Sequence, residues 1–427
     1  MKHDSSTMLL EPPSVPETWE PLDAMEDSIP RPSPTPAWLD RGQIPGLDGL
    51  RAVAILLVLM VRSVQTAGFP EWPLLRRAAH HGYIGVDLFF VVSGFLITTL
   101  LAREWERRGV VNLKRFYLRR FLRIMPAYCG LLITIAICQG LGRFQIAASD
   151  WIGALTYTTN FLNHPSSELG HTWSLSIEEH FYLLWPFVLF FGGAARGWRV
   201  AIGCIAGCWL ARCVIAVGLP RLVSATEVSY YASMAELWTF TRLDTISMGC
   251  LLALACRSSS GRVWLDRLSR PTLLCIYFLV LCASLELDTS TIYHLCVAYS
   301  LHAACLALLI WGLIRSEGLA RRILSNRVLT TIGLGSYSIY LWHRFFIDSR
   351  QTAWMHQFPQ NVFLALAAAL VSYWVIERPF NRLKDRVAAS DGGSDGTHCS
   401  HITDHPSQAS ASEYERSFLK FPTPCRR

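Results

Sequence analysis

The sequence has few charged residues for its length. Asp, Glu, Lys and Arg make up 17% of the 427 residues, against about 25% in soluble domains, while 52% of the residues are hydrophobic. The basic residues lie between apolar runs and do not cluster with exposed aromatic residues, so the pattern does not indicate nucleic-acid binding. This composition excludes an ordinary soluble enzyme and favours a polytopic membrane protein.

The thirteen cysteines lack the spacing of a disulfide framework or a metal site. No CxxC pair occurs, and eleven cysteines lie in or beside apolar runs, where cysteine packs as a small hydrophobic residue. The other two are Cys399 and Cys425, near the C-terminus. We therefore expect no metal site and no bound cofactor.

The two ends of the sequence lack long apolar runs. Residues 1–43 are polar, acidic and rich in proline, without the pattern of a cleavable signal peptide. Residues 387–427 are rich in Ser, Gly, Asp and His. We predict two disordered cytoplasmic tails that flank a membrane domain at residues 44–386.

Between the tails, ten apolar runs approach the length of about 20 residues that a helix needs to cross a membrane. The predicted spans are 50–66, 83–102, 124–141, 174–193, 198–218, 236–256, 271–287, 294–314, 329–348 and 360–377. Residues 151–163 are too short and polar to span, and we expect an interfacial or re-entrant piece there. The expected fold is an all-α polytopic membrane protein with about ten transmembrane helices.

The connections between the runs alternate in basic charge. One set of connections contains 22 Lys and Arg residues and the other set contains 5. Because basic loops stay in the cytoplasm, this alternation predicts that both termini are cytoplasmic.

The segment TWSLSIEEHFYLLWP, residues 172–186, places ionisable side chains at the start of a span: Glu178, Glu179 and His180. Such a group costs roughly 2.5–3.5 kcal/mol inside a span, so it usually faces a wet cavity or a partner. A simpler interpretation is that the acids begin a helix, since Ser176-x-x-Glu179 fits a capping box.

Other spans carry charges that the predicted orientation places in the same outer half of the membrane. They are Arg62, Asp87, Arg242, Asp244, His343 and Arg344. These groups either form ion pairs that hold the bundle together or line a polar cavity open to the outside. We favour the cavity because structural pairing does not require so many groups of mixed type, including a histidine.

On the opposite side of the membrane, the sequence LKRFYLRRFLRI at residues 113–124 spaces Arg115, Arg119 and Arg123 four residues apart. This spacing predicts a basic amphipathic helix on the inner surface. It fits either attraction to anionic lipid or the docking of a phosphorylated donor.

Seven segments occur in the order and at the spacing of one known family. They are PGLDGLRAVAILLV (45–58), GYIGVDLFFVVSGFLITTLL (82–101), FYLRRFLRIMPAY (116–128), GHTWSLSIEEHFYLLWP (170–186), RLDTISMGCLLAL (242–254), LGSYSIYLWH (334–343) and IERPFNR (376–382). Together they resemble the acyltransferase-3 family of bacterial integral membrane acyltransferases. The resemblance implies a ten-helix protein of the bacterial inner membrane. Its activity would be O-acyl transfer, commonly of acetyl from acetyl-CoA as donor substrate, to a hydroxyl of a cell-surface carbohydrate or lipid-linked glycan.

The resemblance also implies roles for single residues. Arg51 matches the family's first-span arginine, and Arg120 with Arg123 matches its RxxR pair, which is thought to serve the CoA donor. The family's catalytic histidine lies eleven residues after the first arginine, and here that position is Arg62. An arginine cannot be deprotonated, so Arg62 cannot act as the base, although it could stabilise an oxyanion. His180 also stands where the family usually has Gln.

Three mechanisms remain open. In the first, His343 acts as the base and is held by Glu178 or Glu179. In the second, another histidine acts as the base, and in the third the chain has lost transferase chemistry and keeps a binding role. The other histidines considered as the base are His171, His180, His80 and His81. A transporter of a polar solute also fits a charged cavity, but no internal repeat or pair of broken helices supports it.

The sequence thus predicts a cytoplasmic acyl-CoA site near Arg51, Arg120 and Arg123. It predicts an outer cavity for the acceptor, around His343 and the two glutamates. The remaining residues expected to line that cavity are Asp87, Arg242, Asp244 and His171. Membrane lipid and a glycan are the expected partners.

Overall fold

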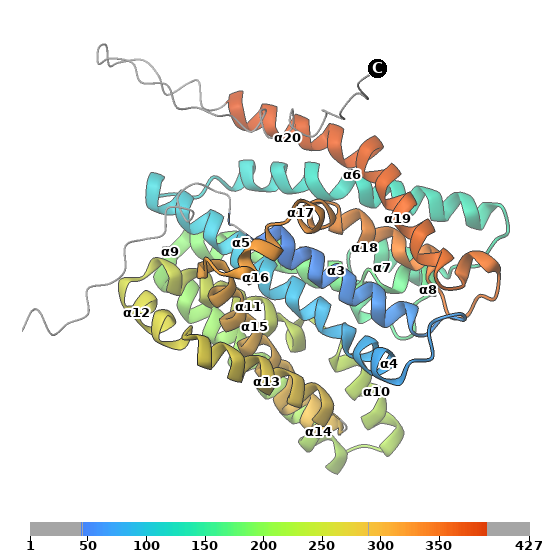
Figure 1. Cartoon of the computed structure of the whole chain (residues 1–427), viewed down its shortest axis with the longest axis horizontal. Helices are drawn as coiled ribbons and strands as arrows, with labels where there is room; N and C mark the ends of the chain where they lie inside the picture. Colours follow the sequence, from blue (N-terminus) through green and yellow to red (C-terminus); the bar gives the residue numbers. More distant parts are fainter. Residues whose placement is uncertain (1–43, 45, 289, 391–427) are drawn as a thin grey trace, which may run out of the picture. The chain divides into compact units, whose positions relative to one another are not determined.

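A computed structural model describes residues 44, 46–288 and 290–390, with side chains as far as Lys384. These residues form helices and no strand, which confirms the all-α prediction (Figure 1). The longer helices are α3 Leu47–Ser63, α5 Ile84–Arg108, α6 Leu113–Gly140, α9 Trp173–Cys213, α11 Thr239–Arg257, α13 Pro271–Leu287, α15 Tyr299–Arg315, α18 Ser336–Phe346 and α19 Gln360–Ser372. Shorter helices are α4 Pro73–His80, α7 Ala148–Leu155, α8 Ser167–Gly170, α10 Ala225–Ala235, α12 Ser259–Leu268, α14 Thr291–Tyr293, α16 Leu319–Leu324, α17 Arg327–Leu334 and α20 Arg378–Ser390. The predicted tails, 1–43 and 387–427, lie wholly or mostly outside the described residues.

Six helical stretches of the described chain are long and apolar enough to cross a membrane, or seven if α12 and α13, bent by 73°, form one span. The protein is therefore a multi-pass membrane protein by length and composition, but the count of ten is not confirmed. Two predicted spans, 174–193 and 198–218, lie in one helical stretch that breaks into two helices at Gly193 (φ 54°). The second helix continues past Cys213 as a π-helical turn, Val214–Gly218. Another predicted span, 329–348, is divided at Gly335 into α17 and α18.

Two local predictions need correction. The capping box at Ser176 is wrong, because α9 begins at Trp173 and the Ser176 hydroxyl donates to the Thr172 carbonyl within the helix. The basic segment 113–124 is not a separate surface helix, because it continues without a break into the rest of α6. Residues 151–163, by contrast, form only the end of the eight-residue α7 and a 3-10 turn, as their polarity predicted.

Helices α5 and α11 are held together by a pair of glycines. A Cβ on Gly94 would lie 2.0 Å from the Ile246 carbonyl oxygen, and one on Gly249 would lie 2.1 Å from that of Val91. No larger residue fits at either position without moving backbone, so the two helices can approach this closely only at glycine. The same two helices are joined by the ion pair between Asp87 on α5 and Arg242 on α11.

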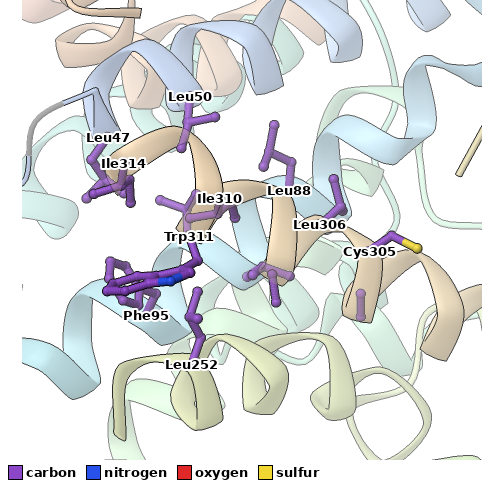
Figure 2. Packing of buried hydrophobic residues seen from close by; sticks show 14 of the residues in the cluster. Leu47, Leu50, Leu88, Phe95, Leu252, Cys305, Leu306, Ile310, Trp311 and Ile314 are labelled. Carbon is purple, nitrogen blue, oxygen red and sulfur yellow. The ribbon is translucent and has the colours of Figure 1, made fainter. Parts of the chain in front are cut away.

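An apolar cluster lies where α15 meets α3, α5 and α11 (Figure 2). Trp311 and Ile310 of α15 are almost fully buried, together with Phe95 of α5 and Leu252 of α11. Because the sides of these helices that face the cluster are apolar, their polar residues are left to line cavities elsewhere in the bundle.

Candidate functional site

The bundle contains two neighbouring cavities lined by charged side chains. The first, here called the narrow cavity, has a volume of about 90 Å³. The second, the wide cavity, has a volume of about 1050 Å³. Val86 of α5 and Tyr340 of α18 line both, so the two cavities share a wall.

The narrow cavity combines arginines with carboxylates. Arg51 of α3 and Arg120 and Arg123 of α6 line it together with Glu178 and Glu179 of α9. From the sequence we expected these arginines and glutamates on opposite sides of the membrane. In the structure they line one cavity. The reason is that α6 continues as one helix, which carries the RxxR pair into the bundle beside the start of α9.

Hydrogen bonds hold one of these glutamates in place. The Ser93 hydroxyl donates to Glu178 Oε1 at 2.8 Å, and the Tyr182 hydroxyl donates to Glu178 Oε2 at 3.3 Å. The Arg120 guanidinium lies over the Tyr182 ring, 3.9 Å from its centre. Tyr182 follows Glu178 by four residues, so both project from one face of α9. Arg120 and Arg123 both line this cavity, and within the described ranges no carboxylate oxygen lies within 4.0 Å of either guanidinium.

The wide cavity is lined by histidines and arginines. His343 of α18, Arg62 of α3 and Arg242 of α11 lie along it, as do His80 and His81. Two acids, Glu236 and Asp288, line it as well. The structure therefore brings His343 to one cavity with four other candidate residues from the sequence, which are Arg62, His80, His81 and Arg242.

The ring of His343 is oriented by a hydrogen bond to the backbone. Its Nδ1 lies 2.6 Å from the Tyr340 carbonyl oxygen, and the side chain is buried. Since a carbonyl oxygen only accepts, Nδ1 must carry the hydrogen, which leaves the lone pair of a neutral ring on Nε2. The hydrogen bond thus fixes the tautomer that a general base needs.

The other histidines are placed differently. His171 is buried and packs against His343, with ring centres 5.3 Å apart, but it lines neither cavity. His180 lines neither cavity either, and its Nδ1 lies 2.7 Å from the Thr239 hydroxyl. His80 and His81 line the wide cavity, and His81 Nε2 lies 3.2 Å from Glu286.

The ion-pair interpretation holds for part of the charged set. Arg242 pairs with Asp87, and both side chains are buried. Asp244 does not line the cavity, because its carboxylate is buried against the Arg212 guanidinium at 2.7 Å. Breaking such a buried pair leaves an uncompensated charge, so these pairs hold α5, α9 and α11 together.

Two groups were missed from the sequence. Arg212 is fully buried and also donates to the Leu295 carbonyl and the Ser300 hydroxyl, both at 2.7 Å. Its only signal was a charge inside a predicted span. The second group is a chain of hydrogen bonds through His294. Its Nδ1 lies 2.6 Å from the Asp288 carboxylate, and its Nε2 lies 2.8 Å from the Tyr299 hydroxyl. Nothing in the spacing of these residues along the sequence indicates it.

Comparison with known proteins gives one family and several relatives. The sequence model of a family described as "Acyltransferase domain" matches residues 44–378. The peptidoglycan O-acetyltransferase OatA of Listeria monocytogenes is 29% identical over 365 residues, covering 80% of this chain and 55% of that protein. The O-acetyltransferase OatA of Staphylococcus aureus (strain NCTC 8325) is 29% identical over 369 residues, covering 79% and 57%.

The chain therefore spans little more than half the length of the curated relatives it matches. No solved structure matches the chain.

Proposed function

Because the chain belongs to the acyltransferase-3 family, we propose that it transfers an acetyl group from acetyl-CoA to a hydroxyl of a cell-envelope carbohydrate. The protein would lie in the bacterial inner membrane with both termini in the cytoplasm. The narrow cavity would receive the donor from the cytoplasm, and the wide cavity would receive the acceptor from the other side.

The observation that carries the proposal is the shared wall. Tyr340 and Val86 separate the two cavities, so a thioester in one and a hydroxyl in the other are divided by a single layer of side chains. Group transfer requires reacting atoms about 3–3.5 Å apart, so the Tyr340 side chain would have to move aside for the thioester to meet the hydroxyl. A movement of one side chain would not be enough if the two cavities were remote from each other.

The donor fits the charges of the narrow cavity. Guanidinium groups bind phosphate oxygens through paired hydrogen bonds, and Arg51, Arg120 and Arg123 line this cavity. Its small volume suits the thin acyl end of acetyl-CoA, while the phosphates would lie at its arginine-lined mouth. Glu178 and Glu179 would balance this positive charge and fix the arginine side chains, and would not hold the base, since they lie away from the cavity that His343 lines.

His343 is the proposed base. Its Nε2 would take the proton of the acceptor hydroxyl as that oxygen attacks the thioester carbonyl carbon. A new C–O bond forms, the C–S bond breaks, and CoA leaves as a thiolate that receives the proton from the His343 imidazolium. Arg62 lines the same cavity as His343 and takes no part in this proton transfer, since an arginine cannot be deprotonated.

The test is transfer of labelled acetyl from acetyl-CoA to envelope glycan in membranes that contain the full chain. His343→Gln should slow transfer by about 10²-fold or more, while His164→Asn, a change at an exposed histidine, leaves it unchanged. Transfer at a near wild-type rate in His343→Gln would contradict the base assignment.

Two further outcomes would replace the proposal. A silent wild type whose Arg62→His variant gains activity would show a degenerate family member with a binding role. Solute uptake that does not depend on acetyl-CoA would show a transporter.

A further inference from the structure

Arg62 is a partly buried arginine without a carboxylate partner. It lies in the last turn of α3 and lines the wide cavity together with Tyr340 and His343. Within the described part of the chain, no Asp or Glu oxygen lies within 4.0 Å of its guanidinium.

Two other arginines of the same bundle are buried and paired with carboxylates. Arg242 lines the same cavity and is paired with Asp87, and Arg212 is paired with Asp244. Both pairs satisfy the rule that a charge inside a membrane domain is matched by a partner. Arg62 breaks that rule, although it lies in a span of the same bundle.

Arg344 is a second arginine near Arg62, but it does not line the wide cavity. Its guanidinium donates to the Ser167 hydroxyl at 2.5 Å and to the Ile347 carbonyl at 3.2 Å, and the carboxylates of Asp348 and Glu168 stabilise its charge. Arg62 therefore lines the cavity with a guanidinium that pairs with no carboxylate of the described residues.

The two acids of the cavity lie at another part of its wall. Asp288 is held by His294 Nδ1 at 2.6 Å and by the Tyr83 hydroxyl at 3.1 Å. Glu236 lies 3.7 Å from His294 Nε2. Both acids are thus grouped around His294 and do not neutralise Arg62.

We propose that Arg62 binds an anionic group of the acceptor, a carboxylate or a phosphate, so that the acceptor is an acidic sugar. The inference rests on the proposed function, because it specifies the substrate that enters the wide cavity. A planar guanidinium matches either anion with two parallel hydrogen bonds. Its position beside His343 places the anion close to the hydroxyl that would be acetylated.

The binding test uses the full chain in lipid nanodiscs and three radiolabelled probes: methyl β-D-glucoside, methyl β-D-glucuronide and methyl β-D-glucoside 6-phosphate. Equilibrium dialysis is carried out at pH 8, where free histidine is mostly neutral. The wild type should bind at least one of the two anionic probes about tenfold more tightly than the neutral one. The probe that binds more tightly identifies the anion as carboxylate or phosphate.

Variants connect this preference to Arg62. Arg62→Gln and Arg62→His should lose it, while Arg143→Gln, at an exposed loop arginine, should keep it. Equal binding of all three probes by the wild type would overturn the proposal, and so would a preference that survives in Arg62→Gln.

Acetyl transfer to the same probes separates this proposal from the function on which it rests. If Arg62 binds the acceptor's anion, Arg62→Gln raises KM for the preferred anionic probe and leaves the kinetics with the neutral probe nearly unchanged. An equal fall in kcat for the neutral and anionic probes would instead assign Arg62 to the reacting carbonyl and overturn the proposal. If the anion preference in binding depends on Arg62 but no probe is acetylated, the acetyltransferase function fails and the anion site remains.

Discussion

The narrow and wide cavities are both lined by arginines and carboxylates, but the two kinds of charge are paired differently in each. In the narrow cavity, three arginines face two glutamates, one of which is fixed by Ser93 and Tyr182. In the wide cavity, Arg242 is neutralised by Asp87 while Arg62 is not neutralised. This difference supports the proposal that the narrow cavity would bind a phosphorylated donor and that the wide cavity would bind and activate an acceptor.

The largest expected effect separates the cavities by kinetics. His343→Gln should lower kcat by about 10²- to 10⁴-fold, the usual contribution of a general base, while KM for acetyl-CoA stays near the wild-type value. Initial rates at saturating and limiting acetyl-CoA provide the measurement. A rise in KM for acetyl-CoA without a change in kcat would contradict the assignment of the base to the wide cavity and of the donor to the narrow one.

The next effect concerns the ion pairs beside the wide cavity. Asp244→Asn leaves the buried Arg212 charge unmatched and should lower the free energy of unfolding by about 3–5 kcal/mol. The thermal unfolding midpoint in detergent measures the loss. The exposed loop residue Glu317, changed to Gln, is the control and should have little effect. A normal midpoint for Asp244→Asn would mean that this pair does not hold the bundle.

A smaller effect is expected in the narrow cavity. Arg123→Gln should raise KM for acetyl-CoA by about 10- to 100-fold, because a charged hydrogen bond contributes about 1.5–3 kcal/mol. The same variant should leave KM for the acceptor unchanged. A variant that weakens acceptor binding instead would assign Arg123 to the wide cavity and reverse the comparison.

The smallest effect concerns the rim of the wide cavity. Burial raises the pKa of Asp288, but the hydrogen bond and charge of His294 and the Tyr83 hydroxyl outweigh it and lower the pKa below its usual value. A lowered pKa stabilises the folded state above pH of about 4, and that stability is lost as the pH falls through the lowered value.

Asp288→Asn should therefore lower the free energy of unfolding at pH 7 by about 1–2 kcal/mol. The thermal unfolding midpoint should fall modestly as a result. The difference from wild type should disappear in strong acid. A difference that does not change with pH would show that the Asp288 charge contributes nothing.

The helical fold could be predicted because apolar runs and glycines are local signals. Gly94 is such a glycine, because a Cβ at this position would meet the Ile246 carbonyl oxygen. The pairing of Asp244 with Arg212 could not be predicted, since the two residues lie on helices α11 and α9 and nothing in their spacing links them. Depth along a span was also a poor guide to the partners of Glu178, because the direction in which a side chain points depends on how helices rotate against each other.

The thin wall formed by Val86 and Tyr340 has an electrical consequence. With water-filled cavities open to opposite faces, as proposed, the membrane voltage falls mainly across that wall and not across the full bilayer. Moving one elementary charge through such a field costs about 2.3 kcal/mol per 100 mV. An acetyl group is neutral and crosses without this cost, so the cell's voltage would neither drive nor oppose its passage. A smaller side chain at Tyr340 would open a leak for ions at the same place.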